Sequence, residues 1–368
     1  MIDEICKKED CAACFACADI CPVNAIALKY SEHTTQPIIE SEKCISCKKC
    51  KRVCPVNNPV KKSSIKKAYA VYSLDESTRR ACASGGLITQ ICREFDGIIY
   101  GASFTSPLEV SHIRIEDKKD LYKIQGSKYV HSHINFCYRD AQNDLKSGKN
   151  VLFTGTPCQI AGLKSYLGKD YSNLYTIDII CHGVPERNTL KTYIESNCKN
   201  SDKCTGIRFR DEKGWHMTLL NGSKVIEGLD FGTNFYYHGF LEGWTYRESC
   251  YNCPYANADR TSDLTAGDFW GVGEPLSNEL KKGLSVALVI TDKGQRLIDS
   301  ISEKVFIEER QIQEAVRGNG QLNHPSTNSK NAQKFRTLLK KHDADYALKN
   351  TVLKKKIVFA LRKIKSKG

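Results

Sequence analysis

Between residues 11 and 55 the chain repeats one cysteine spacing twice, and this repeat constrains the fold more than any other feature. Within each run, three cysteines are separated by two residues each, and a fourth follows after three more residues, directly before a proline. The runs are Cys11, Cys14, Cys17, Cys21 with Pro22, and Cys44, Cys47, Cys50, Cys54 with Pro55. Three thiolates in one tight loop can hold one face of an iron–sulfur cube, and the proline prevents the segment from continuing as a helix. The pattern therefore predicts two 4Fe–4S clusters.

Runs of this kind exchange their fourth ligand in bacterial two-cluster ferredoxins. One expected ligand set is Cys11, Cys14, Cys17 and Cys54, and the other is Cys44, Cys47, Cys50 and Cys21. The alternatives are zinc knuckles and a disulfide framework, but zinc sites use two CxxC pairs rather than a triple followed by Cys-Pro. Residues 1–58 are therefore predicted to form an α+β ferredoxin-like module that holds both clusters.

The rest of the 368-residue chain is long enough for a further globular body with a large core. The first ten residues are charged, and the most hydrophobic run, residues 284–290, has the length of a strand. We therefore expect no secretory signal, no membrane span and a cytoplasmic protein. In that compartment the 18 cysteines should be reduced, which favours metal ligation over disulfides.

The net charge of +13 is concentrated at the C-terminal end. Twelve basic and two acidic residues, a net +10, lie from Lys334 onward. Residues 326–368 are predicted to form a basic helical tail, with residues 354–365 as an amphipathic helix. This tail is either solvated or docks on an acidic protein or an anionic membrane surface. A nucleic-acid-binding role is disfavoured because the charge is a tail rather than a patch interleaved with aromatic residues.

Between the module and the tail, strand and helix patterns alternate, which predicts an α/β body. The expected strands are residues 68–73, 97–103, 150–154 and 175–180, and the expected helices are residues 87–95 and 159–167. Residues 59–67, polar with one proline, are predicted to be a linker. We divide the body into a first part, residues 68–149, and a second part, residues 150–325.

Two expected strands end in loops that carry a cysteine, Cys158 and Cys181, and a local pair follows at Cys250 and Cys253. Ligands of open α/β sheets bind beyond the carboxyl ends of the strands, so these thiols can meet there and hold a third 4Fe–4S cluster. The alternative is two core cysteines and a separate structural or redox pair. The other six cysteines are treated as structural: Cys6, Cys82, Cys92, Cys137, Cys198 and Cys204.

Five ordered motifs resemble the beta-subunit family of deazaflavin-coenzyme-reducing hydrogenases and dehydrogenases, in which a two-cluster ferredoxin module in front is common. They are Ser84-Gly85-Gly86, Gln125-Gly126-Ser127-Lys128-Tyr129, Gly155-Thr156-Pro157-Cys158-Gln159, Cys181-His182-Gly183-Val184-Pro185 and the stretch from Arg260 through Asp263, Gly267 and Asp268 to Gly271. The resemblance implies that the α/β body binds FAD and a 4Fe–4S cluster and passes electrons between them.

The implied cofactor-binding residues are Ser84, Gly85, Gly86, Gly126, Ser127, Lys128, Thr154, Gly155, Thr156 and Pro157. The serine and glycines would offer backbone N–H groups to pyrophosphate at a helix N-terminus, although a glycine turn with a serine cap has the same pattern. Lys128 would place a positive charge near phosphate or the reduced flavin, unless it is a surface lysine. His182 would move protons, unless it bonds a cluster sulfur.

The sequence thus predicts an iron–sulfur flavoprotein oxidoreductase that exchanges electrons with a redox partner protein or reduced ferredoxin. Its substrate is the deazaflavin coenzyme or an unidentified metabolite, for example in polysaccharide biosynthesis. The alternatives are an electron-transfer subunit without its own substrate site and a non-redox binding or assembly protein.

Overall fold

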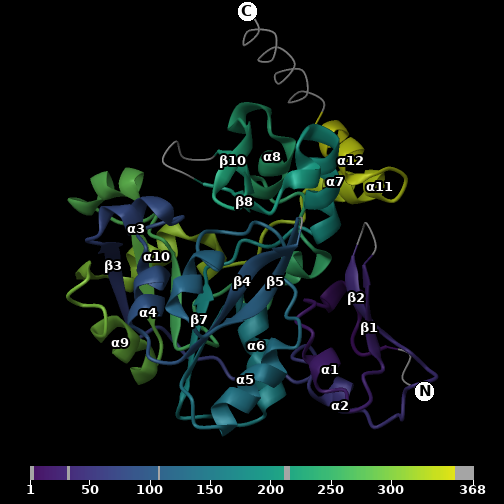
Figure 1. Ribbon diagram of the computed structural model, residues 1–368, viewed down its shortest axis with the longest axis horizontal. Coiled ribbons are helices and arrows are strands. Elements are labelled where there is room, and N and C mark those ends of the chain that lie inside the picture. Colours follow the sequence, from purple (N-terminus) through teal and green to yellow (C-terminus); the bar gives the residue numbers. More distant parts are fainter. Residues whose placement is uncertain (1–3, 31–33, 107, 211–215, 353–368) are drawn as a thin grey trace, which may run out of the picture.

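The computed structural model describes residues 4–30, 34–106, 108–210 and 216–352. The predicted amphipathic helix at residues 354–365 lies outside these residues. Figure 1 shows the N-terminal module beside the lower part of a large sheet, with a smaller layer of strands and helices above that sheet. None of the helices in the described ranges is long and apolar enough to cross a membrane.

The body is built on an eight-stranded mixed sheet in the order β13-β3-β12-β11-β7-β6-β4-β5. In chain order its strands are β3 (Lys67–Ser73), β4 (Ile98–Ser106), β5 (Glu109–Ile115), β6 (Val151–Gly155), β7 (Leu174–Ile179), β11 (Leu264–Asp268), β12 (Ser285–Val289) and β13 (Val305–Arg310). The four central strands β11, β7, β6 and β4 run parallel, and every other pairing is antiparallel. The α/β pattern was therefore expected correctly, and the antiparallel flanks make the sheet mixed.

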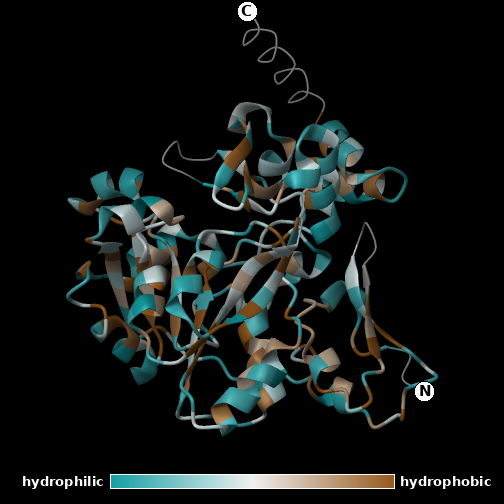
Figure 2. Ribbon diagram, viewed as in Figure 1, coloured by the Kyte–Doolittle hydropathy of each residue, from teal (hydrophilic) through white to brown (hydrophobic). Residues whose placement is uncertain are grey.

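Helices pack on this sheet and connect its strands. They are α3 (Glu76–Ala81), α4 (Leu87–Glu94), α5 (Cys137–Lys146), α6 (Pro157–Leu167), α9 (Asp292–Asp299) and α10 (Ile312–Gly318). The start of α6 follows from local chemistry, because Thr156 and Gln159 form a capping box and Pro157 occupies the first turn. Hydrophilic residues predominate on the outer helices α5 and α9 (Figure 2).

A second, smaller layer lies above the large sheet in the view of Figure 1. It contains a three-stranded antiparallel sheet and four helices: β8 (Gly206–Arg208), β9 (Met217–Asn221), β10 (Lys224–Leu229), α7 (Arg187–Asn197), α8 (Phe235–Leu241), α11 (Lys330–Leu339) and α12 (Ala344–Thr351). Trp244, Tyr236 and Phe209 are buried in its core with Phe335 and Leu348. The described part of the predicted tail, α11 and α12, is thus packed into the protein.

The N-terminal module contains the hairpin β1 (Ile26–Tyr30) and β2 (Thr35–Ile39) and the short helices α1 (Ala16–Asp19) and α2 (Lys49–Arg52). Its apolar residues join those of α5 and α6 in one buried cluster. In addition, Asp19 accepts a hydrogen bond from the backbone N–H of Tyr138 at 3.1 Å. The predicted linker also touches the body, since Ser63 pairs with Arg260. The module is therefore packed on the body rather than tethered beside it.

Candidate iron–sulfur and flavin site

The two cysteine runs of the module have the same backbone shape. The residues on either side of the second cysteine have positive φ, with Ala13 at 49° and Phe15 at 60° in the first run and Ser46 at 54° and Lys48 at 60° in the second. Such left-handed residues turn the chain sharply. A four-residue helix, α1 or α2, then carries the third cysteine of each run. The spacing repeat is thus a repeat of local structure.

The thiols of the runs line two different cavities. A cavity of about 20 Å³ is lined by Cys21, Cys44, Cys47 and Cys50, which we call the outer set. A cavity of about 380 Å³ is lined by Cys11, Cys14, Cys17 and Cys54, the inner set. The structure therefore groups Cys21 with the second run and Cys54 with the first, which is the exchange that two-cluster ferredoxins show.

The larger cavity is shared with the body. Its wall also contains four thiols that we call the body set: Cys158, Cys181, Cys250 and Cys253. Cys158 lies in the first turn of α6, Cys181 follows β7, and the other two lie at the short 3₁₀ helix η5 (Glu248–Asn252). The expected convergence of these loops is therefore present. Gly162 of α6 lets the module approach closely, because a Cβ there would lie 3.0 Å from the Cβ of Cys14.

The four residues of the body set are half-buried, and the protein around their sulfur atoms opposes charge on them. Burial raises the pKa of the Cys158 thiol to about 11 and that of Cys250 to about 12. The hydroxyl of Thr156 lies 3.1 Å from the Cys158 sulfur. Since thiolates are the form that binds metal, these thiols require a cationic ligand such as cluster iron to become charged together. Among the described residues, no three Cys, His, Asp or Glu side chains lie close enough to share a single metal ion.

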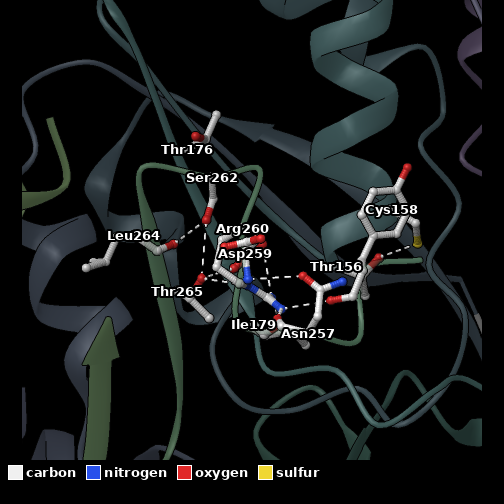
Figure 3. Close-up of polar contacts among 12 residues, drawn as sticks. Thr156, Cys158, Thr176, Ile179, Asn257, Asp259, Arg260, Ser262, Leu264 and Thr265 are labelled. Atoms are coloured by element: carbon white, nitrogen blue, oxygen red, sulfur yellow. Dashed lines mark hydrogen bonds and ion pairs between the residues drawn. The ribbon is translucent and has the colours of Figure 1, made fainter. Parts of the chain in front are cut away.

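A buried network around Arg260 positions the loop of the body set (Figure 3). The guanidinium donates to the backbone oxygens of Tyr255 and Asn257 just after Cys253. It also lies 3.1 Å from a carboxylate oxygen of Asp178 on β7, the strand that leads to Cys181. Arg260 is 3 % exposed and Asp178 is fully buried. The motif residue Arg260 thus ties two ligand-bearing segments together.

A second buried pair joins the body to the module. Arg247 and Glu186 form an ion pair, and they are 5 % and 6 % exposed. Arg247 also donates to the backbone oxygens of Cys11 at 3.2 Å and Thr35 at 3.0 Å. Thr35 in turn donates to Glu186 through its N–H and its hydroxyl. We call this cluster the Arg247 latch. Glu186 lies five positions after Cys181, and Arg247 lies three positions before Cys250.

Cys6, treated as structural on sequence grounds, lies at the inner set. Its side chain hydrogen-bonds with Cys11 and Cys54, and these bonds raise the pKa of the Cys6 thiol. No spacing rule could have shown this, because Cys6 is outside both runs and reaches them only through the fold. The remaining five unassigned cysteines do not line this cavity.

The predicted flavin segments lie along one edge of the large sheet. Gln125 donates to the sulfur of Cys82 at 3.3 Å, which places the 125–128 loop beside the 82–86 segment. Ser84 donates to the backbone oxygen of Leu284, and Gly85 and Gly86 are buried. A Cβ on Gly85 would lie 2.4 Å from the backbone oxygen of Val71. Close packing on β3 and β12 is therefore one reason for glycine at this position.

The third predicted flavin segment, residues 154–157, begins at the end of β6. His112 lies 3.0 Å from the backbone oxygen of Thr154, and the positive charge of Lys128 acts on His112. A Cβ on Gly101 would lie 3.0 Å from the Thr154 hydroxyl and 3.2 Å from Ile124, so the residue just before the 125–128 loop packs beside the end of β6. Gly126 has a φ of +78° and open space where a Cβ would stand. The positive φ, rather than close packing, is therefore the reason for glycine at this position.

The two predicted catalytic residues occupy different places. Lys128 donates to the backbone oxygen of Gln125 at 2.8 Å, and burial lowers its pKa to about 7. His182 is exposed at the wall of the larger cavity, and its backbone oxygen accepts from Ser326. Near the motif that ends at Gly271, Arg210 pairs with Asp268 at 2.9 Å.

Comparisons with known proteins match the N-terminal module and the body to two different families. Residues 10–58 match the model of the family described as 4Fe-4S dicluster domain. Residues 148–315 match the model for the C terminus of the coenzyme F420 hydrogenase/dehydrogenase beta subunit. No curated protein matches the chain. A solved chain of the F420-reducing NiFe hydrogenase complex from Methanosarcina barkeri is 15% identical, with a TM-score of 0.47, and the match covers 79% of this chain and 92% of that chain.

The paired cysteine runs and the converging body set therefore fall within the two matched regions. The chain therefore joins a region that matches the 4Fe-4S dicluster domain to a region that matches the C terminus of the coenzyme F420 hydrogenase/dehydrogenase beta subunit.

Proposed function

We propose that the chain is an iron–sulfur flavoprotein oxidoreductase with three 4Fe–4S clusters and one FAD. The observation that carries this proposal is the single cavity lined by the inner set of the module and the body set. The inner set and the body set each supply four of the thiols in its wall, and four thiolates per cluster is the requirement of a 4Fe–4S centre. Such an arrangement supports electron exchange between the module and the body.

The residues around the cavity fit this role. The Arg260 network holds the loop of Cys253 against β7, and the Arg247 latch holds the Cys11 loop against the body. Outer contacts of this kind orient metal ligands and tune the centre. The pKa of Cys11 is lowered first by its hydrogen bond with Cys6 and further by the buried positive charge that Arg247 brings near Cys11 and Cys250. This charge acts on a bound cluster as well. It would therefore favour the more negative, reduced form of a bound cluster.

The flavin would be held by residues 84–86, 126–128 and 154–157, and it would supply the two-electron hydride chemistry that clusters lack. Lys128 adds a cation whose pKa is lowered to about 7 by burial, so it can hold or release a proton near neutral pH. The proposed substrate is the deazaflavin coenzyme or another hydride-accepting metabolite. His182, exposed at the cavity wall, is the proposed proton carrier on that side.

Anaerobic purification with quantified iron, sulfide and flavin tests the proposal. Three 4Fe–4S clusters predict about twelve iron atoms per chain, and the proposed flavin site predicts one FAD per chain. Replacing Cys158 with Ser should remove the iron of one cluster and leave the other two. Cys204→Ser is the matched control, because this buried thiol lies outside the cavity and donates to the backbone oxygen of Gly206, a bond that a hydroxyl can also make. About eight iron atoms in the unmodified protein, or unchanged iron in Cys158→Ser, would contradict the third cluster.

A second function to distinguish is that of an electron-transfer subunit without its own substrate site. The outer set, which lies at the exposed end of the module, favours an exchange of electrons with another protein. In that case the purified chain would reduce and reoxidise its centres but would turn over no hydride acceptor. Steady-state assays with the deazaflavin coenzyme, and with a panel of sugar metabolites, separate the two functions.

A further inference from the structure

The outer and inner sets differ in what surrounds them. The inner set faces the body across the shared cavity. The wall around the outer set instead includes Val23 and Ile45, whose side chains are 37 % and 60 % exposed. Cys44 and Cys47 are themselves only half-buried. A centre held by the outer set would therefore lie just beneath an exposed apolar surface.

This apolar surface is bordered by strong positive charge. Lys48, Lys49, Lys51 and Arg52 are exposed on and beside α2, and none of them has an ion-pair partner among the described residues. Lys48 and Lys49 also line the outer cavity. Ile38, 42 % exposed, is a further exposed apolar residue of the module. We call Val23, Ile45 and the four cations the outer patch.

We propose that the outer patch is the docking surface for a small acidic electron-carrier protein, which exchanges single electrons at the outer set. An apolar centre with a charged rim is the usual anatomy of a protein interface. Unpaired cations on the rim would attract an acidic partner and raise its association rate. This inference rests on the proposed iron–sulfur function of the module and adds the site and the charge of the partner.

The composition of the surface favours a protein over a nucleic acid. Proteins that bind single strands stack bases on aromatic side chains, and residues 34–62 contain no aromatic residue. The apolar residues come from separate loops rather than from one amphipathic helix, which disfavours insertion into a membrane surface.

The test uses the full chain and an acidic flavodoxin as the probe. In each transfer the fully reduced flavodoxin loses one electron and one oxidised cluster of the chain gains it. Stopped-flow mixing measures this rate, and calorimetry measures binding of oxidised flavodoxin, a readout that needs no electron transfer. At about 0.02 M salt, Lys49→Glu/Lys51→Glu should slow the transfer and weaken binding by about tenfold, and at about 0.5 M salt the difference should vanish.

The matched control is Lys340→Glu/Lys341→Glu, which reverses the charge of two adjacent exposed lysines at the end of α11. Lys49→Gln/Lys51→Gln, which removes charge without reversing it, should give a smaller effect in the same direction. All variants should keep the wild-type iron content and be reduced by dithionite to the same extent, which separates a docking defect from failure to hold clusters.

Equal rates and affinities for the patch and control variants would overturn the docking proposal and leave the cluster assignment intact. Binding of an oligonucleotide or of anionic vesicles that is lost in the patch variant, without any flavodoxin binding, would overturn it as well. Loss of iron from the unmodified protein would instead count against the proposed function, while calorimetry would still decide whether the patch binds flavodoxin.

Discussion

At the scale of single residues, Gly162 shows how one missing side chain permits the shared cavity. A Cβ at this position would lie 2.8 Å from the Tyr138 hydroxyl and 3.1 Å from the Cys14 sulfur. Gly162 lies inside α6, where alanine would otherwise be preferred by about 1 kcal/mol. The glycine is therefore explained by the approach of the Cys14 loop rather than by helix geometry.

We expect Gly162→Ala to destabilise the protein despite the gain in helix propensity. Overpacking of a tight interior costs ~1–3 kcal/mol, which exceeds the ~1 kcal/mol that alanine contributes in a helix. Anaerobic urea unfolding measures the net effect. Gly206→Ala is the control, because the nearest atom to its added Cβ lies at 3.8 Å. A Gly162→Ala protein more stable than the wild type would show that the Cys14 loop does not need this space.

At the scale of elements, the Arg247 latch fixes β2 and the Cys11 loop to the segments that carry the body set. Both charged side chains are buried, and the remaining oxygen of Glu186 accepts from Thr35. Removing one partner of a buried pair leaves an uncompensated charge, which usually costs ~3–5 kcal/mol. Removing both charges costs less, because no ion then remains buried.

Arg247→Gln is therefore expected to lower the free energy of unfolding by ~3–5 kcal/mol, and Arg247→Gln/Glu186→Gln is expected to recover part of that loss. Urea unfolding of these two variants and of Glu186→Gln measures the coupling. Lys66→Gln, which breaks the exposed pair with Asp292, serves as the control and should leave the unfolding midpoint unchanged. If the double variant is as unstable as the sum of its single variants, the pair does not act as a latch.

Residue patterns predicted the elements whose signals are local. The apolar runs at residues 68–73, 150–154 and 175–180 became β3, β6 and β7, and the capping chemistry of Thr156 marks the start of α6. β5 was not expected, because its sequence includes a histidine and an arginine. His112 can be buried there only because Ser132 and Thr154 provide partners from distant segments.

In the candidate site too, the features that are local in the sequence were predicted and those that depend on the tertiary fold were not. Cysteine spacing is local, so it predicts the thiol sets that the structure groups around two cavities. The charged residues around these thiols come from distant parts of the sequence. Arg247 pairs with Glu186, 61 positions away in the chain, and Arg260 pairs with Asp178, 82 positions away. Arginine and carboxylate residues are common on any surface. Only the tertiary fold distinguishes these buried pairs from solvated ones.

At the scale of the whole molecule, three histidines lie between the module and the sheet, of which His112 and His131 are buried and His133 is half-buried. His131 and His133 pack against Phe15 of the module, and the ring of His112 stacks on Phe153 of β6. Burial is the main cause that lowers the pKa of each, to about 4 for His112 and His133. The positive charge of Lys128 adds to the effect at His112. The native protein therefore keeps these imidazoles neutral at pH values where an unfolded chain would charge them.

This difference predicts that stability falls as the pH drops. The pKa of His112 is 6.5 when unshifted and about 4 in the folded protein, so between these values the unfolded chain binds more protons. Stability should therefore be constant above pH 6.5 and decrease below it, by up to about 3 kcal/mol at pH 4 for this residue. Urea midpoints of the wild type and His112→Gln between pH 5 and 7 measure the effect. Acid acts on the clusters of both proteins alike, so the decisive quantity is the difference between their pH slopes. The variant should lose less stability on acidification, because its amide cannot take up the proton, and parallel slopes would show that His112 does not contribute.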